Sequence, residues 1–455
     1  MEYRDFVQFG VSDPACGNRC GDLYDTKEKS IQVKESSMKK VILLLAILTM
    51  GLPRANAQEY ELASETTIDI ARQFAKDLFE LNGVPYLQPM VNAINATSNT
   101  GFFNTAYIPK QDTFYVKFSV HGMMGVVPDK YKTYTPQFPI EPLDLGKLNE
   151  YGDFDLINQS FDIQDTAGLI YYAFKTVLYD GVTQGRFPGV PDQASTILGT
   201  MDADLTLDPM VLDSLVRENI AFPFLPKDMQ DSILSIVHQF PEQFTLPAGA
   251  DISSIFAAVP QVVLGSYMGT EALIRYIPKV NLGENIGNFS FWGFGIKHSI
   301  SQYIPDPYLD IAIQGVYQGT SLDNEVGVTE AQLEADATIF HANLQFSKSF
   351  EGIIDVYGGI GYESISIDSK YEYYLPIEVQ YQLGMVKLDK ETNKLVADPP
   401  DYPGDTKVQT STVSVEDSSI KGTLGVAKSF GGFRVFIDYN IRDYHIFQGG
   451  IQYTF

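Results

Sequence analysis

Histidines are the side chains of this 455-residue chain best suited to metal binding and to acid–base chemistry. The five histidines are His121, His238, His298, His341 and His445. No two of them have the spacing of metal ligands, and the sequence has no G-x-S-x-G, H-E-x-x-H or phosphate-loop motif. We therefore expect no enzymatic activity, no bound metal and no cofactor.

Two groups of aspartates could provide a different chemistry, because clustered carboxylates bind calcium or bridge through divalent ions to lipopolysaccharide phosphates. The groups are Asp153, Asp155, Asp162 and Asp165, and Asp202, Asp204 and Asp208. Neither group has the complete spacing of a calcium-binding loop. We expect both to be solvated acidic loops.

The composition limits the class of protein that these residues belong to. With 57 acidic and 32 basic side chains, the net charge is −25, which argues against nucleic-acid binding. The chain is 44% hydrophobic and 13% aromatic, too apolar for a disordered protein. No apolar run approaches 20 residues, so the sequence does not predict a bundle of membrane-spanning helices.

A targeting signal begins inside the sequence, at Met38. Two lysines, the apolar run 41–48 and the small residues Ala55 and Ala57 follow in the order of a secretory signal peptide, with cleavage expected before Gln58. We interpret 38–57 as the signal peptide and 1–37 as an over-extended N-terminus. The alternative is a genuine cytoplasmic extension.

Both cysteines, Cys16 and Cys20, precede this signal. The mature chain would then lack disulfides, and an exported protein without them requires an extensive hydrogen-bonded architecture. The residue after the cleavage site is Gln58 rather than cysteine, which excludes a lipid anchor at that position.

The mature chain opens with a helical or irregular element over 58–110. Apolar residues recur there at spacings of three and four, on one helical face. They are Ile68, Ala71, Phe74, Ala75, Leu78 and Phe79. After Gly83 the chain becomes rich in Asn, Pro and Gly. We expect a plug-like element that packs inside or beneath the main body.

From residue 111 the periodicity changes to two, as in strands with one apolar and one polar face. We count thirteen candidate strands, which begin near 113, 154, 166, 195, 262, 271, 289, 308, 338, 353, 420, 433 and 447. Bacterial membrane barrels have even strand numbers. We therefore predict an all-β fold, a transmembrane antiparallel β-barrel of 12–14 strands over 111–455, interrupted by two amphipathic helices at about 207–250.

The connections between the expected strands differ in length. Short turns such as 348–352 and 428–432 alternate with longer polar stretches such as 369–410, which is typical of outer-membrane barrels. A soluble β-sandwich is the alternative, but its outward faces would be plainly polar. Tyrosine and phenylalanine at many strand ends favour the membrane barrel instead.

The C-terminal strand ends with Ile451, Tyr453 and Phe455 on one face. This pattern resembles the signal that the barrel-assembly machinery of the outer membrane recognises. The alternative is an ordinary final strand of a soluble sheet. The signal implies insertion into the outer membrane of a Gram-negative bacterium, in contact with outer-membrane lipid and lipopolysaccharide.

Four segments carry a wider resemblance over most of 58–455. They are 101–106 (GFFNTA), 271–279 (EALIRYIPK), 293–299 (GFGIKHS) and 356–362 (VYGGIGY). Through them the chain resembles a family of uncharacterised Bacteroidetes outer-membrane proteins of unknown function. An N-terminal non-strand element before a barrel is distantly similar to the long-chain fatty-acid transporters of the outer membrane, which implies a hatch.

Strand alternation places one set of polar residues towards the barrel lumen. They are Lys421, Arg434, Asp438, Asn440 and Arg442. Such charges either set the permeability of a pore or neutralise one another in a plugged barrel. The leading hypothesis is a passive transporter or channel for a small hydrophobic molecule, which requires an apolar pocket continuous with the N-terminal element. The alternative is a closed structural or docking barrel without transport.

Overall fold

The computed structural model describes residues 60–110, 112–155, 160–219, 222–224, 227–281, 288–326, 331–350 and 353–455. The expected signal peptide, its cleavage residues Ala55, Ala57 and Gln58, and the region 1–37 lie outside these ranges. Within the described ranges, no helix combines the length and the apolar character that crossing a bilayer requires.

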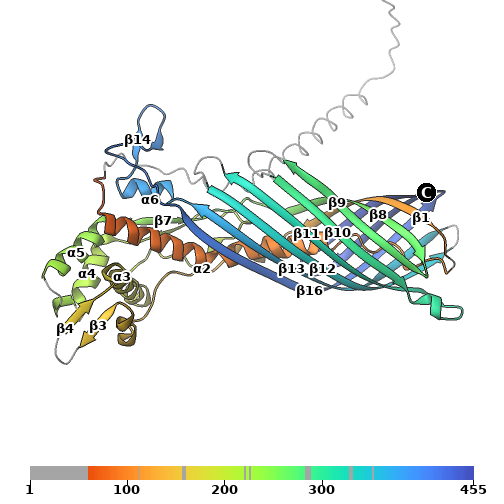
Figure 1. The fold of residues 1–455 in the computed structure, drawn as a ribbon, viewed down its shortest axis with the longest axis horizontal. Helices are drawn as coiled ribbons and strands as arrows, with labels where there is room; N and C mark the ends of the chain where they lie inside the picture. Colours follow the sequence, from red (N-terminus) through yellow and green to blue (C-terminus); the bar gives the residue numbers. More distant parts are fainter. Residues whose placement is uncertain are drawn as a thin grey trace, which may run out of the picture.

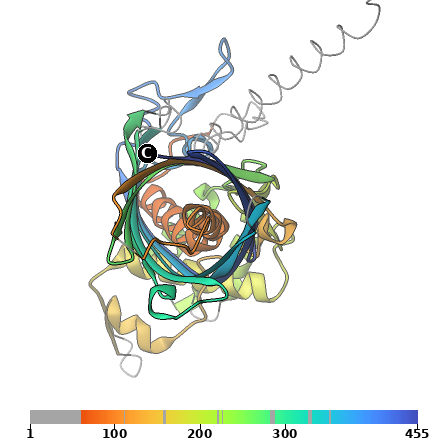
Figure 2. The same cartoon turned by 90° about the vertical axis from the view of Figure 1, so that its right-hand side faces the viewer.

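Ten antiparallel strands form a closed barrel (Figures 1 and 2). They are β1 (Tyr115–Val126), β8 (Ser254–Tyr267), β9 (Thr270–Asn281), β10 (Asn288–Ser299), β11 (Asp310–Val326), β12 (Ala331–Phe350), β13 (Ile354–Tyr373), β16 (Gln409–Phe430), β17 (Phe433–Ile441) and β18 (His445–Thr454). β1 closes the barrel because it pairs with both β18 and β8. The predicted all-β antiparallel barrel is confirmed, but the predicted 12–14 strands are wrong.

Three of the thirteen candidate strands lie outside the barrel, which accounts for the difference. The first is a separate hairpin of β3 (Gly152–Asp155) and β4 (Ser160–Ile163). The second is the helix α3 (Thr166–Thr183), and the third contributes only to the short strands β5 (Ala194–Ser195) and β6 (Ala203–Thr206). The other ten candidates each overlap a barrel strand.

The segment of α3 resembles a strand because it is rich in aromatic and β-branched residues. Its buried residues Ile170, Phe174 and Val177 are four and three residues apart, which is a helical spacing. Asp165 begins the helix, since its carboxylate accepts a hydrogen bond from Gly168 N at 2.9 Å. Helical packing therefore prevails over the strand preference of the residues.

The N-terminal element is dominated by one long helix, α2 (Glu65–Ser98), whose first turn is capped by Ser64. It continues through the Asn-, Pro- and Gly-rich stretch and contains Pro85 and Pro89. Several residues around these prolines are buried, among them Asn82, Tyr86 and Val91, so tertiary packing holds this part of the helix. It starts outside the barrel and enters the lumen, where Figure 2 shows it along the barrel axis.

A helical region, which we call the head, lies beside one end of the barrel (Figure 1). It comprises the connection 127–253 between β1 and β8, the connection 374–408 between β13 and β16, and the first half of α2. Its remaining elements are β2 (Thr133–Tyr134), α4 (Pro209–Glu218), α5 (Lys227–Gln239), β7 (Gln243–Leu246), α6 (Ile377–Gln382), β14 (Lys387–Asp389), β15 (Lys394–Val396) and the 3₁₀ turns Asp129–Tyr131, Leu145–Glu150 and Phe222–Phe224. One more 3₁₀ turn, Ser301–Tyr303, belongs to the barrel and joins β10 to β11. The head is built around Phe74 of α2, whose ring meets Phe174, Phe240 and Phe244 at centroid distances of 4.8–6.0 Å.

The barrel wall is taller on one side. β11, β12, β13 and β16 contain 17–22 residues, whereas β17 contains nine. The longer strands extend towards the head and cover one side of α2 (Figure 1). We call the halves of β11, β12, β13 and β16 that are nearest the head the extended wall. The chain therefore has a closed barrel at one end and a partly enclosed helix at the other.

Candidate functional site: an occupied lumen

The five residues expected to face the lumen all lie on the inner side of the barrel. Lys421, Asp438 and Asn440 are buried, and the guanidinium groups of Arg434 and Arg442 are nearly so. Asn440 donates to Asp438 at 2.7 Å, and Thr423 donates to Asn440 at 2.6 Å. These side chains bond to one another and to the N-terminal segment rather than lining an open channel.

Glu363 on β13 is the centre of one buried ion cluster. Its carboxylate lies 2.7 Å from Lys421 Nζ and 2.6 Å from Arg442 Nη1. Arg442 also pairs with Asp417, which accepts a hydrogen bond from Asn95 of α2 at 2.7 Å. Burying charges is costly unless each has partners, so this cluster depends on all of its members.

A second cluster surrounds Glu271 on β9. Lys117 Nζ lies 2.5 Å from one carboxylate oxygen, and Lys297 Nζ lies 2.6 Å from the other. Tyr115 donates its hydroxyl to the same carboxylate at 2.6 Å. Two lysines thus share one buried carboxylate, and Lys297 donates its further hydrogen bond to Thr105 O of the N-terminal segment, at 3.2 Å.

Arg275 on β9 binds the end of α2. The side chain is buried, and its guanidinium donates to Ser98 O at 2.9 Å and to Thr100 O at 2.8 Å. The guanidinium carbon also lies 3.9 Å from the centroid of the Phe102 ring. No ion pair between Arg275 and a carboxylate occurs among the described residues, so its partners are carbonyls, the Gln261 and Gln318 amides and one aromatic face.

Lys421 binds the same helix end, donating to Asn99 O at 2.7 Å. The last carbonyls of a helix lack intrahelical donors and carry a partial negative charge. Two barrel cations therefore satisfy the C-terminus of α2 from opposite sides of the lumen.

After the C-terminus of α2, residues 99–110 continue through the lumen without regular structure. Asn104 donates to Gln452 of β18 at 2.9 Å and accepts from Arg434 of β17 at 2.8 Å. Ala106 N donates to Ser347 of β12 at 2.9 Å, and Gln318 of β11 bonds to Asn99 at 3.1 Å. Side-chain bonds from residues 95–106 thus reach β9, β10, β11, β12, β16, β17 and β18. We call residues 86–106 the lumen segment.

Two histidines belong to this packed interior. His121 bonds to Ser119 and Gln448, whereas the ring of His341 lies against Phe102 at 4.9 Å, with neither nitrogen hydrogen-bonded in the described part of the chain. Phe102 and Phe103 form a small apolar cluster with Val316, Tyr357 and Phe436. In the described ranges no three His, Cys, Asp or Glu residues are placed to hold a metal ion.

The aspartate groups have local structural roles in part. Asp165 and Asp208 cap the N-termini of α3 and α4. Asp153 and Asp162 face each other across the β3–β4 hairpin. In the head, Tyr171 of α3 donates to Asp77 of α2 at 2.6 Å, and burial together with this bond raises the pKa of the tyrosine.

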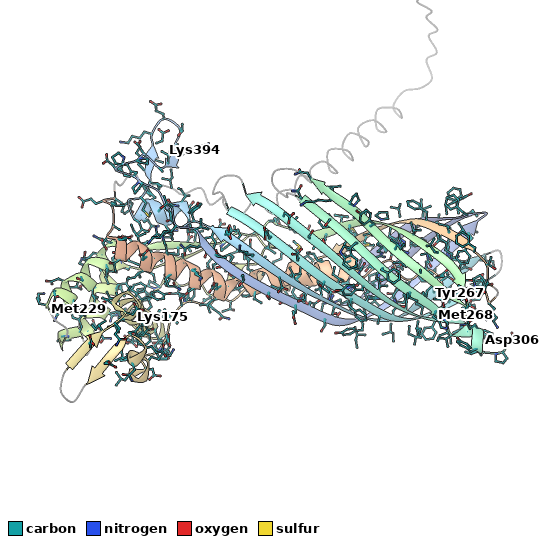
Figure 3. All side chains as sticks on the ribbon, in the orientation of Figure 1. Lys175, Met229, Tyr267, Met268, Asp306 and Lys394 are labelled. Carbon is teal, nitrogen blue, oxygen red and sulfur yellow. The ribbon has the colours of Figure 1, made fainter. Side chains whose placement is uncertain are left out.

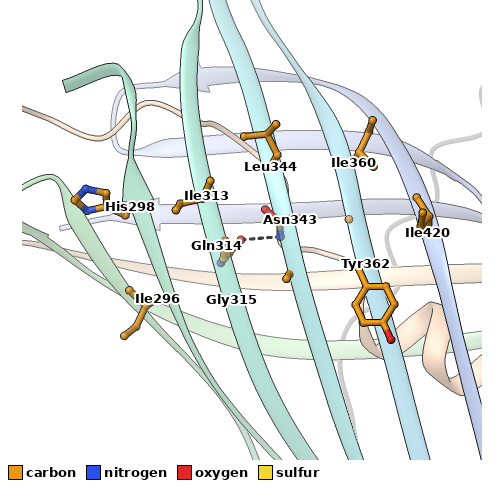
Figure 4. A pocket seen from close by; sticks show the side chains of 12 residues that line it. Ile296, His298, Ile313, Gln314, Gly315, Asn343, Leu344, Ile360, Tyr362 and Ile420 are labelled. Carbon is orange, nitrogen blue, oxygen red and sulfur yellow. Dashed lines mark hydrogen bonds between the residues drawn. The ribbon is translucent and has the colours of Figure 1, made fainter. Parts of the chain in front are cut away.

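The proposed C-terminal signal lies on the outside of the barrel. Ile451 and Phe455 are exposed, and the ring of Tyr453 lies 4.7 Å from both Phe433 and Phe455. Other large apolar side chains are exposed on the barrel, among them Tyr267 and Met268 at the end away from the head (Figure 3). Two hollows in the structure are also on this surface, one of them where Gly315 leaves space between Ile313, Leu344 and Ile360 (Figure 4).

Arg275, Glu271 and Glu363 were not singled out from the sequence, although each occupies an alternating position in an expected strand. Successive side chains of a strand point to opposite faces, so Arg275 points inwards where Ile274 points outwards on β9. In the same way, Glu363 points inwards where Tyr362 points outwards on β13. The alternation of the strands could therefore have identified these charged residues as facing the lumen. Their partners in the lumen segment, by contrast, have no signature in the sequence.

Comparisons with known proteins give a family but no activity. None of the curated proteins compared matches the chain. The attachment invasion locus protein Ail of Yersinia pestis is 11% identical with a TM-score of 0.19, over 41% of this chain and 93% of Ail. A Pseudomonas aeruginosa FadL homologue is 8% identical with a TM-score of 0.18, over 87% of this chain and 98% of the homologue. Likenesses this low carry no argument about function.

The Bacteroidetes origin expected from the sequence stays a prediction. A family model, described as a family of unknown function (DUF6588), matches residues 38–455. Because this match covers most of the chain, the protein belongs to that family.

Proposed function

We propose that this protein is an outer-membrane β-barrel whose lumen is closed by its own lumen segment. The barrel would anchor the head, and the head would serve as a docking platform for other molecules. The observation that carries the proposal is the hydrogen bonding of residues 95–106 to seven of the ten strands. A segment bonded on all sides of the lumen blocks the path that a passive solute would take.

The outer face supports a position in the membrane. On β13 the outward residues from Ile354 to Tyr362 are apolar or glycine, and the outward positions beyond them are Ser364, Ser366 and Asp368. Nine residues is the length with which a tilted strand spans a bilayer. An apolar band of this height facing lipid, and the exposed C-terminal Ile451 and Phe455, fit insertion by the barrel-assembly machinery.

The two ends of the barrel differ in the way that outer-membrane barrels do. The long connections 127–253 and 374–408 leave one end, and Phe455 lies at the other. Long loops face the cell exterior in such barrels. The head would then lie at the cell surface, near lipopolysaccharide. Trypsin added to intact cells should cleave at exposed Lys394; protection of that site until the cells are lysed would contradict this orientation.

Passive transport of a small hydrophobic molecule is the competing function. It would require the lumen segment to leave its place, which separates Arg275 and Lys421 from the carbonyls of Ser98 and Asn99. Each buried group left without a partner costs about 1–3 kcal/mol, or more when it is charged. The described contacts therefore favour the closed barrel.

Single-channel recording in planar bilayers tests the proposal. Deleting 58–110 would be a poor variant, because it also removes Phe74 from the head. The double variant Arg275→Ala/Lys421→Ala removes two cations that hold the lumen segment and leaves Phe74 in the head, although Glu363 also loses Lys421. Lys370→Ala, in an exposed ion pair with Glu372, is the matched control.

We expect silence from the wild type and from Lys370→Ala, and intermittent openings from the double variant. Heat-modifiable gel migration verifies that each protein is folded. A steady conductance of the folded wild type would overturn the proposal and favour transport.

A further inference from the structure

The extended wall ends in a strand edge without a neighbour. β16 pairs with β13 over most of its length, from Gln409 to Ala427, but pairs with β17 only from Gly422 to Phe430. Over 409–421 no described strand lies on the other side of β16. Figure 1 shows this part of β16 as the border of the extended wall, next to α2.

Two hydrogen bonds identify the backbone groups that face the open side. Ser369 of β13 donates to Val413 O at 2.8 Å, and Gln88 of α2 donates to Glu416 O at 2.8 Å. In an antiparallel ladder, alternate residues direct both backbone groups to the same neighbour. The odd-numbered residues therefore pair with β13, and the even-numbered ones direct N–H and C=O outwards. These are Thr410, Thr412, Ser414, Glu416 and Ser418; because Glu416 O already accepts from Gln88, an added strand would pair with the other outward groups.

The helix beside this edge carries two exposed apolar side chains among polar ones. One side of α2 packs against the extended wall. The ring of Phe79 stacks on that of Tyr371 of β13 with centroids 5.4 Å apart, and a Cβ added to Gly83 would lie 3.0 Å from the Val413 side chain of β16. The next face carries Leu81 and Val84, which are 38% and 40% exposed. A strand added beyond β16 would continue the wall and cover these two side chains.

The charges next to the edge define the chemistry of the added strand. Glu416 points to the outer side of the wall, with no ion pair among those that the described residues form. Asp368 on β13 lies on the same outer surface and accepts only a hydroxyl bond, from Ser414 at 2.6 Å. A cross-strand partner opposite this acidic surface would be stabilised by a basic side chain.

We infer that the edge of β16 over 410–418 binds an extended segment of another protein by adding one strand to the wall. The segment has apolar side chains facing Leu81 and Val84, alternating with basic side chains facing Glu416. This is strand addition, in which backbone bonds give affinity and alternate side chains give specificity. The inference rests on the docking role proposed above and names its binding surface.

A second copy of this chain is a poorer occupant. Two β16 edges would pair antiparallel through a two-fold axis perpendicular to the wall, and therefore parallel to the membrane plane. That axis would turn one barrel upside down relative to the other. An extended segment from a different chain has no such restriction.

The test measures binding of a fluorescent nine-residue peptide of alternating lysine and valine to the full-length protein in detergent. A peptide of the same composition, with all lysines at one end, is the control for general attraction to an acidic protein. Ser414→Pro removes one outward N–H, which an edge strand tolerates, and Ser414→Ala keeps it. Both variants lose the same hydroxyl bond to Asp368.

We expect the alternating peptide to bind the wild type and Ser414→Ala equally, and Ser414→Pro at least tenfold more weakly. Glu416→Lys should weaken binding several-fold, and Val84→Ser should do the same. Equal affinity for Ser414→Pro and Ser414→Ala, or for the two peptides, would overturn the inference. Gel migration verifies folding in each case. Failure of binding with a silent lumen refutes this surface alone, whereas a conducting wild type refutes the closed barrel.

Discussion

The two halves of α2 differ in the buried polar bonds that hold them. The first half packs Ile68, Ala71, Phe74 and Leu78 into the apolar core of the head. The second half packs Tyr86, Val91, Ala93 and Ala96 against apolar residues of the barrel. In addition, it ends among buried ions and amides, where Arg275 and Lys421 bind its terminal carbonyls. One continuous helix thus joins a region stabilised by apolar burial to a region where buried polar bonds at the helix end are added to apolar burial.

The difference concerns how each region responds to damage. Apolar burial is non-directional and scales with area, so a smaller side chain weakens it gradually. Buried polar networks are directional, and losing one member leaves others unsatisfied. The head should therefore tolerate rearrangement, whereas the lumen segment should be fixed in one position until a partner is removed.

The largest expected effect is in the head. Phe74→Ala removes a fully buried ring that contacts three other phenylalanines, which should cost about 3–5 kcal/mol. Hydrogen–deuterium exchange should accelerate in α3, α5 and residues 65–78, while β17 remains protected. Equal acceleration in the head and in β17 would show that the two regions are not separable.

A smaller effect is expected in the lumen. Lys421→Met leaves Asn99 O without its donor and breaks the buried ion pair with Glu363. Because Glu363 keeps Arg442, the cost should be about 3 kcal/mol, the lower limit for a broken buried pair. Exchange should accelerate at residues 95–100 and remain slow at 65–78. The reverse pattern would contradict the assignment of Lys421 to the helix end.

The smallest effect is a pH dependence at the start of α2. Partial burial raises the pKa of Asp69, but hydrogen bonds from Lys407 and Arg72 outweigh it and lower the pKa below its ordinary value. The stabilisation is therefore present above the ordinary pKa of the carboxyl and is lost as the pH falls through the lowered one.

Because Asp69 is half exposed, this loss should not exceed about 1 kcal/mol. Exchange at residues 65–72 between pH 5 and pH 3, corrected for intrinsic rates, measures it, and Asp69→Asn should remove the dependence. An unchanged dependence in Asp69→Asn would assign it to another carboxyl.

The sequence predicts the barrel better than its contents. Strand alternation identified ten strands because an apolar outer face repeats every second residue. It failed for 166–179, where aromatic residues suit a strand but Asp165 caps a helix. It also did not predict that α2 would continue past Gly83, since enclosure by the wall overrides the local preference of Pro85 and Pro89.

The candidate site was predictable only in part. Alternation indicated that Lys421 and Arg442 face inwards, because inward direction is a local property of a strand. It could not indicate Glu363 as their shared partner, which is 58 residues from Lys421 in sequence and 79 from Arg442. Which carbonyls a cation binds depends on the register between a helix and a barrel, and no periodicity records that register.

The occupied lumen can be tested most directly by thiol labelling. Thr97→Cys is nearly isosteric and lies buried in the lumen segment, whereas Ser418→Cys is exposed on the extended wall; the chain from Gln58 has no other cysteine. In liposomes, a small charged maleimide should label Ser418→Cys within minutes and leave Thr97→Cys unmodified until denaturant is added. Rapid labelling of Thr97→Cys in the folded protein would contradict a closed barrel.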